Sequence, residues 1–343
     1  MPCLFLLTQV APHGSRNDYQ ISSNGDTIVF AARVPGREKA WKTNIDIYLV
    51  PTDGSQPPVA ISRPNEGADS SPRFSPDGKS IIWLSMRTPG YESDQNKLML
   101  YTIESKKTRM IMESWDRSPE EVHFVSSGQL VVAAQDTGRL LLFSIDIKSE
   151  TKTALTTNGS MHSWSIVDQS VLGLADSMTS PARIVSIDIL ARQITQLVSR
   201  NDVSLMIEPS EFWFTGADDS QVHGWLVKPY GYDPKKTYPL AFLIHGGPEG
   251  AWNDDFGYRW NPQVWAGAGY FVAMINPQGS TGYGQEFTKA ILGNWGGAPY
   301  QTLMKGLDTV LANNPQIDPR RVAVRFGYIG SWSQLRRVYD QLD

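Results

Sequence analysis

The 343-residue sequence contains a single cysteine, Cys3, so no disulfide can form within the chain. Its five histidines are scattered, and no Cys/His cluster has the spacing of a zinc site. No run reaches 18 apolar residues, so the sequence predicts no transmembrane helix and no membrane partner. These absences leave a protein that must be stabilised by its own hydrophobic core.

The sequence also has no excess of positive charge, because 35 acidic residues outnumber 31 basic ones. The net charge is -4, which disfavours nucleic acid as a partner because a polyanion would be repelled. The first seven residues are apolar, but they lack a basic stretch and are too few for a signal peptide, so the compartment stays open. A hydrophobic fraction of 41% is typical of a globular protein, and the length favours two domains.

A hairpin pattern recurs along the first two thirds of the chain. Each copy has a short apolar run, a turn with Asn-Gly, Asp-Gly or Ser-Gly, and a second apolar run; glycine supplies the positive φ that such turns need. The copies are residues 21–30, 74–83 and 124–133, with a degenerate fourth at 166–174.

A second recurring strand follows each hairpin, at residues 46–50, 97–101, 139–143 and 182–186. Equivalent positions are 53, 42 and 42 residues apart, and a period of this size with about four strands per unit is typical of β-propeller blades. The alternative is a β-sandwich. We predict a partial propeller of about four blades over residues 1–207, because a closed ring usually needs more.

The remainder has an α/β pattern. Expected strands cover residues 212–215, 222–227, 240–244, 269–275 and 321–324, and helical periodicity covers 285–292 and 300–313. Strands alternating with helices predict a mostly parallel sheet with helices on its faces. We therefore expect the first part of an α/β-hydrolase domain over residues 208–343, with an aberrant tail from about 325.

The apolar run at 240–244 leads directly into His245-Gly246-Gly247-Pro248. Glycines at the end of a strand can turn backbone N–H groups towards a developing oxyanion and let a substrate approach closely. We predict an oxyanion pocket at His245, Gly246 and Gly247, with His245 lining the pocket. The alternative is a tight turn between strand and loop.

A nucleophile for such a pocket is missing. An α/β hydrolase carries its serine in Gly-x-Ser-x-Gly after a buried strand, with the acid and the histidine later in the chain. The sequence contains no such motif, and only twelve residues, none of them histidine, follow Ser331, the nearest serine in position. We therefore expect no complete catalytic triad and interpret Ser331 as an ordinary surface residue.

Six motifs in a fixed order resemble those of the prolyl oligopeptidase family of serine peptidases, and within it the dipeptidyl-peptidase V group of fungi. They are Tyr-Glu-Ser-Asp at 91–94, Trp-Asp-Arg-Ser-Pro at 115–119, His-Gly-Gly-Pro at 245–248, Trp-Asn-Pro at 260–262, Asn-Pro-Gln-Gly-Ser-Thr-Gly-Tyr-Gly at 276–284 and Asn-Trp-Gly-Gly-Ala-Pro-Tyr at 294–300. The likeness extends to about Val324.

The resemblance implies a propeller over an α/β-hydrolase domain, peptide substrates, release of dipeptides from their amino termini, and no metal or organic cofactor. The glycine-rich run at 279–284 lacks the pattern of a phosphate loop, so we interpret Asn276, Gly279, Ser280 and Tyr283 as an active-site rim; the alternative is a plain loop. A carboxylate from the propeller is the natural partner of the substrate ammonium group, and our candidates are Glu92 and Asp94; the alternative is that each is a solvated loop acid. Fungal members of the family are typically exported, although no export signal is visible here.

Because the triad is absent, we interpret the sequence as the middle of a larger peptidase, truncated at both ends and inactive as given. Two alternatives remain open. The first is a non-catalytic propeller that binds peptides or proteins, which would need a closed ring of blades. The second is an esterase on the same hydrolase fold, which the presence of a propeller disfavours.

Overall fold

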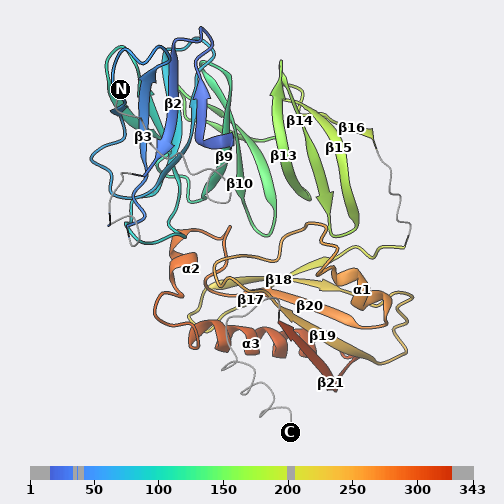
Figure 1. The fold of residues 1–343 in the computed structure, drawn as a ribbon. Helices are drawn as coiled ribbons and strands as arrows, with labels where there is room; N and C mark the ends of the chain where they lie inside the picture. The colour runs from blue at the N-terminus through green and yellow to red at the C-terminus, as the bar shows by residue number, and fades with distance from the viewer. Residues whose placement is uncertain (1–15, 34–36, 38–41, 199–204, 327–343) are drawn as a thin grey trace.

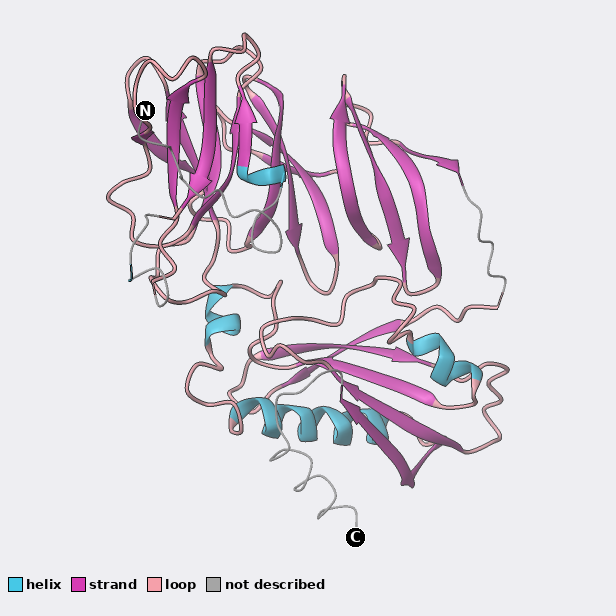
Figure 2. Cartoon of the chain, in the orientation of Figure 1, coloured by secondary structure: helices cyan, strands magenta, loops and turns pink. Residues whose placement is uncertain are grey.

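The computed structural model describes residues 16–33, 37, 42–198 and 205–326. Four small sheets stand side by side over a fifth sheet, which carries the helices (Figure 1). Strands dominate the upper part, whereas the lower part mixes strands and helices (Figure 2). The change from one kind of sheet to the other falls between Val198 and Ser210. The boundary at 207/208 stays a prediction.

Each of the four small sheets is antiparallel and joins strands that are consecutive in the sequence; we call them blades I to IV. Blade I follows the short 3-10 helix η1 (Arg16–Asp18) and comprises β1 (Tyr19–Ile21), β2 (Thr27–Ala32), β3 (Asp46–Pro51) and β4 (Val59–Ala60). Blade II comprises β5 (Asp69–Phe74), β6 (Ser80–Ser85), β7 (Lys97–Thr102) and β8 (Lys107–Ile111). Blade III comprises β9 (Pro119–Ser126), β10 (Gln129–Gln135), β11 (Leu140–Asp146) and β12 (Lys152–Ala154). Blade IV comprises β13 (Ser160–Val167), β14 (Ser170–Ser177), β15 (Ser180–Asp188) and β16 (Ile194–Val198).

The sequence repeat is confirmed blade by blade. The four hairpin copies form the first two strands of blades I to IV, and the second recurring strand is the third strand of each blade. Gly25 and Gly78 occupy the first two turns with φ of +79° and +68°, a conformation that only glycine adopts without strain. The turn chemistry therefore sets the register of the two strands on either side.

The blades are held together face to face by apolar side chains. Because side chains alternate along a strand, β10 serves two interfaces: Val132 packs towards blade II, whereas Val131 packs against Trp164 of blade IV. All three residues are at most 2% exposed. Each blade thus buries its faces against its neighbours, as stacked repeats must.

The fifth sheet has the order β17-β18-β20-β19-β21. Its strands are β17 (Ser210–Thr215), β18 (Gln221–Val227), β19 (Tyr238–Ile244), β20 (Phe271–Asn276) and β21 (Ile317–Phe326). The predicted strands are present, but the expectation of a mostly parallel sheet is wrong. β17, β18 and β20 pair antiparallel, and only β19 pairs parallel, with β20 and with β21. The reason is that the first two strands form a hairpin, which cannot be parallel.

Helices cover the two faces of this sheet differently. α3 (Ala298–Asn313) packs Leu303 and Leu307 against Phe242 on one face, and α1 (Pro262–Gly267) packs Ala266 on the other face, which also meets Met178 of blade IV. α2 (Gln285–Lys289) is shorter than the periodicity predicted, and α1 was not predicted because six residues are too few to show a period. None of the helices in the described part of the chain has the length and apolarity to cross a bilayer.

The core of the fifth sheet supplies a stability test. Phe242 is fully buried between β19 and α3. Phe242→Ala is expected to lower the free energy of unfolding by about 3–5 kcal/mol, because it removes buried apolar surface and leaves a cavity. Urea unfolding followed by tryptophan fluorescence measures this. Val264→Ala is the control: Val264 is 70% exposed on α1, and a change within about 0.5 kcal/mol is expected there. Equal midpoints for the two variants would contradict the assigned core.

Candidate functional site

The sequence-predicted pocket lies where two neighbouring strands end. β19 and β20 run parallel, so their carboxyl ends meet at one edge of the sheet. His245 follows β19 directly, and Asn276 is the last residue of β20. β21 also runs parallel to β19, so its own carboxyl end, Phe326, reaches the same edge. Ligands of open α/β sheets bind at this kind of edge.

His245 is held by two hydrogen bonds. Its Nδ1 lies 3.0 Å from the carbonyl oxygen of Gly246, and its Nε2 lies 3.0 Å from Oγ of Ser280. A carbonyl can only accept, so Nδ1 carries the proton, and Nε2 accepts the hydroxyl hydrogen of Ser280. Burial lowers the pKa of His245, which keeps the ring neutral.

A serine hydroxyl bonded to a neutral imidazole is also the geometry of an activated nucleophile. Ser280, however, is 0% exposed, and its carbonyl oxygen accepts a hydrogen bond from Oγ1 of Thr288 (3.1 Å). No substrate can reach a hydroxyl in that position. The Ser280–His245 pair therefore fastens the loop after β20 to the loop after β19.

Gly246 and Gly247 lie at the turn that follows. Gly247 has a φ of +143°, and a Cβ there would lie 2.7 Å from the backbone nitrogen of Glu249, so only glycine fits. The N–H groups of Gly246 and Gly247 donate to no acceptor within the described ranges. Among the described residues, therefore, no acceptor competes with an anionic oxygen for these two donors.

Behind this turn, Asn276 holds the next part of the loop. Its Oδ1 accepts from the backbone N–H of Trp252 (2.7 Å), and its Nδ2 donates to the carbonyl of Trp252 (3.1 Å) and to the hydroxyl of Tyr283 (2.7 Å). Asn276 is fully buried. The amide thereby fixes the loop after β19 and the rim residue Tyr283 to the end of β20.

The network continues to His223, on β18. Since the Tyr283 oxygen accepts from Asn276, its own hydrogen points to His223 Nδ1, 2.7 Å away, which leaves the ring proton on Nε2. Nε2 lies 3.4 Å from Oε2 of Glu211, and the carboxylate favours the protonated ring mainly through its charge, which by itself would raise the pKa of His223. Burial dominates and lowers the pKa of His223 to about 4, and it raises that of Tyr283. Both groups are neutral at physiological pH.

An ion pair joins this network to blade III. The Arg139 guanidinium binds the Glu211 carboxylate, and it lies 4.9 Å above the Trp225 ring. Gly138 packs against His223 and Trp225 so closely that a Cβ would meet Trp225 Nε1 at 3.1 Å. Arg139, Glu211 and His223 were not predicted as a group from the sequence. The signal that could have indicated them is the alternation of aromatic and polar residues along β17 and β18.

The predicted rim residues belong to a loop docked on the blades. Gly279 has a φ of +99°, and its N–H donates to the carbonyl of Phe287 (2.9 Å). Further along, Thr281 Oγ1 donates to Gln135 Oε1 (2.5 Å). Gly284 approaches Asp116 so closely that a Cβ would lie 2.3 Å from its carboxylate. The loop that carries the predicted rim residues thus lies at the junction between blades II and III and the fifth sheet.

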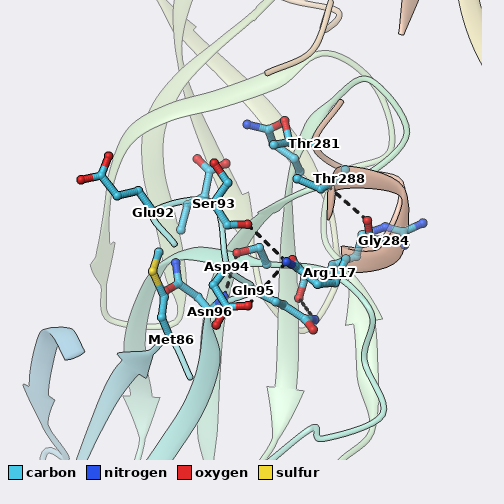
Figure 3. Close-up of a pocket in the computed structure, with 15 residues that line it drawn as sticks. Met86, Glu92, Ser93, Asp94, Gln95, Asn96, Arg117, Thr281, Gly284 and Thr288 are labelled. Carbon is cyan, nitrogen blue, oxygen red and sulfur yellow. Dashed lines mark hydrogen bonds between the residues drawn. The ribbon is translucent and has the colours of Figure 1, made fainter. Parts of the chain in front are cut away.

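A cavity of about 200 Å³ opens at this junction (Figure 3). Its walls come from the Tyr-Glu-Ser-Asp loop, from the start of β9 and from the rim loop, so the structure brings Glu92 and Asp94 together with Thr281 and Gly284. The cation Arg117 lines the same cavity, but its Nε is paired with Asp136 at 2.8 Å. The unpaired charge of the cavity is therefore acidic.

The two carboxylates predicted to bind the substrate amine, those of Glu92 and Asp94, differ in their hydrogen bonding and exposure. Asp94 Oδ2 accepts from the backbone N–H groups of Arg87 (2.8 Å) and Thr88 (2.7 Å), which caps its own loop. Glu92 is exposed, and Figure 3 shows its side chain pointing away from Arg117 and Gly284. Neither carboxylate is directed mainly at the cavity.

Glu120, at the start of β9, is a third acid of the cavity. Its side chain is exposed to solvent at one side, yet the surrounding protein partly desolvates the carboxyl and raises its pKa. The neighbours that oppose this shift are Gln135 and, through its charge, His162. The sequence analysis missed Glu120 because an acid in Pro-Glu-Glu looks like a solvated strand end; the preceding Trp-Asp-Arg-Ser motif was the available signal.

The fold defines the class of the protein: propeller-like blades joined to a mixed sheet of the α/β-hydrolase type. Pyrococcus horikoshii acylaminoacyl peptidase superposes with a TM-score of 0.74 at 24% identity, over 90% of this chain and 48% of that chain. Residues 256–328 match the Prolyl oligopeptidase family. The chain is 38% identical to a "Probable dipeptidyl-peptidase 5" of Emericella nidulans (94% of this chain, 48% of the relative) and 41% identical to the "Dipeptidyl-peptidase 5" of Trichophyton schoenleinii (89% and 44%).

These matches place the chain in the prolyl oligopeptidase family. It spans about half the length of the curated relatives that it matches. A nucleophile would be expected after β21, and Ser331, which the sequence analysis considered there, lies outside the described residues.

The buried network yields a test. Tyr283→Phe removes the hydroxyl that pairs both Asn276 and His223, two fully buried side chains. We expect the free energy of unfolding to fall by about 2–3 kcal/mol, because unpaired buried polar groups keep their desolvation cost. Urea denaturation at pH 7.5 measures this. Tyr258→Phe, at an 83% exposed position, is the matched control and should be neutral. An unchanged free energy of unfolding in Tyr283→Phe would contradict a stabilising role of this network.

Proposed function

We propose that this chain forms the peptide-recognising part of a dipeptidyl-peptidase-type serine peptidase. The observation that carries the proposal is the junction itself. On one side lie the N–H groups of Gly246 and Gly247, which have no acceptor in the described part of the chain, and on the other lies an acidic cavity between the blades and the rim loop. Identity of 38–41% with dipeptidyl-peptidases 5 over about nine tenths of the chain supports it.

In this proposal the N–H groups of Gly246 and Gly247 stabilise the oxyanion that forms when the scissile carbonyl is attacked. His245 lines the pocket and, through Ser280, keeps the turn in position. Asn276 and Tyr283 hold the loop behind it. These groups are preorganised by their own hydrogen bonds, so they need no rearrangement when charge develops.

The acidic cavity would hold the ammonium group of the substrate's amino terminus. We assign this contact to Glu120 before Glu92 and Asp94, because Asp94 already accepts two backbone hydrogen bonds and Glu92 points away. A carboxylate with a raised pKa gains most from a cationic partner, since the ion pair offsets the desolvation of its charge.

A specific observation favours binding without cleavage as the second function. The 343 residues contain no Gly-x-Ser-x-Gly. A polypeptide of this sequence would then recognise peptides without hydrolysing them, because neither a nucleophile nor its general base is supplied.

The absence of chemistry can be tested directly. We expect no labelling of the purified 343-residue polypeptide by a fluorophosphonate probe and no release of dipeptides from a peptide with a free amino terminus. A serine peptidase of the same family is the positive control in both assays. Labelling that heat denaturation abolishes, together with dipeptide release, would show that the chain carries its own nucleophile.

The amine contact is tested by calorimetric titration with a dipeptide amide and its N-acetylated counterpart. The free amine is expected to bind at least about tenfold more tightly, which is about 1.4 kcal/mol, and Glu120→Gln should remove most of this preference. Glu92→Gln is the matched control, since it makes the same change on the same cavity. If Glu92→Gln alone lost the preference for the free amine, the ammonium contact would belong to Glu92 and not to Glu120.

A further inference from the structure

The turn between β10 and β11 of blade III is embedded in the junction with the fifth sheet. The Asp136 N–H donates to the carbonyl of Arg139 (2.9 Å), which closes a tight hairpin turn. Its two central residues, Thr137 and Gly138, have φ of +51° and +67°, as in the type I′ turns that join hairpin strands. We call residues 135–139, the end of β10 and this turn together, the spacer turn.

Thr137 is an unusual residue for its position in this turn. A β-branched side chain is strained at positive φ, and Thr137 is the only β-branched residue among the non-glycine residues with positive φ in the described ranges. Its N–H donates to the carbonyl of Gly282 (3.0 Å), in the loop after β20. Strained backbone persists where the surrounding structure holds it in place, and such positions concentrate at ligand-binding regions.

The loop after β19 holds the spacer turn through Asp254. The Asp254 backbone N–H donates to the carbonyl of Gly138 (2.7 Å). Its Oδ1 accepts from the backbone N–H of Met178 (2.8 Å), and its Oδ2 accepts from that of Gly159 (3.0 Å), both at the edge of blade IV. One aspartate thus binds backbone groups of three separate turns, so blades III and IV are fastened to the same point of this loop.

The side chains at the two ends of the spacer turn make the remaining contacts. Gln135 Oε1 accepts from Thr281 Oγ1 (2.5 Å), in the loop after β20, and the Arg139 guanidinium binds the carboxylate of Glu211 on β17. Together with the two central residues, four of the five residues contact both loops and a strand of the fifth sheet. The turn therefore fixes the separation between blade III and this sheet.

The two groups proposed to bind a peptide lie on opposite sides of this separation. Glu120 is on β9, which pairs with β10 up to Ala134, the residue before the spacer turn, and Gln135 lines the same cavity as Glu120. The Gly246–Gly247 turn follows β19 of the fifth sheet. A change in the length of the spacer turn would consequently change the distance between the two groups.

We propose that the spacer turn determines the length of the peptide that the junction binds. A peptide with free ends places its ammonium group at Glu120 and its carboxylate, which stands in for the oxyanion, at the N–H groups of Gly246 and Gly247. Because the separation of these groups is fixed, only one backbone length pairs both charged ends. The inference rests on the proposed function and adds the residues that set the length.

Lengthening the spacer turn should change the preferred peptide length. One glycine inserted between Thr137 and Gly138 adds up to about 3.5 Å of chain and gives a three-residue turn, which hairpins also use. Titrations followed by nuclear magnetic resonance measure Kd for Ala-Ala and Ala-Ala-Ala, both with free ends, on the 343-residue protein. We expect the wild type to bind Ala-Ala at least about tenfold more tightly, because the tripeptide leaves one charged end unpaired, and the insertion to reduce this ratio to about threefold or less.

A glycine inserted after Gly54 is the matched control. Gly54 lies in the β3–β4 connection with open space around it, so the ratio of the two Kd values should stay at the wild-type value there. A wild-type ratio in the spacer-turn insertion would overturn the proposal. Should that insertion fail to fold, Thr281→Val decides, since it removes the hydroxyl bound to Gln135 and should lower the ratio at least about threefold. Thr195→Val, at an exposed position on β16, should leave the ratio unchanged.

A distance measurement separates failure of this inference from failure of the proposed function. Spin labels at Lys148→Cys in blade III and Asp308→Cys on α3, both exposed, report the separation by double electron–electron resonance in a Cys3→Ser background. The spacer-turn insertion should lengthen it by about 2–3 Å. An unchanged distance, or a longer one with a wild-type ratio, would overturn the spacer role alone. A wild-type protein that binds neither peptide would contradict the proposed function, and the length selection with it.

Discussion

The parallel pairing of β19 with β20 is the constraint on which the rest depends. It brings the ends of two strands to one edge of the sheet, so the loops that follow His245 and Asn276 leave side by side. Both loops then reach the blades. The first docks through Asp254 on blades III and IV, and the second docks through Thr281 on blade III. Each of these hydrogen bonds uses at least one side chain, so the junction depends on the identity of Asp254 and Thr281 as well as on loop shape.

Charge is distributed unevenly over the junction. At its centre, His223, His245 and Tyr283 are all driven to their neutral forms by burial, and each is hydrogen-bonded to a neighbour that fixes its tautomer or hydroxyl direction. Ionised groups lie at the margins, where solvent still reaches Glu120. The centre is thus insensitive to pH near neutrality, whereas the margins can respond to a ligand.

The blades could be predicted from sequence because each repeats a local signal, a glycine turn between two apolar runs, whose outcome does not depend on distant residues. The buried strands β19 and β20 were equally visible as continuous apolar runs. The order of the strands in the sheet could not be predicted from sequence. The position of β20 between β18 and β19 is one of several possible pairings, and the hydrophobic pattern along the chain does not distinguish them. The short α1 also escaped, since six residues have no measurable period.

For the site, the sequence by itself determined the chemistry at hand: the glycines of the His-Gly-Gly-Pro turn, the rim motif, and the lack of Gly-x-Ser-x-Gly among the 343 residues. Only the tertiary structure decided which carboxylates line the cavity, that Ser280 is buried against His245, and that Asp254 binds three separate turns. The physical reason is that burial and hydrogen bonding at the junction depend on segments 35 to 169 residues apart in the sequence, and residue order alone does not reveal which of them meet.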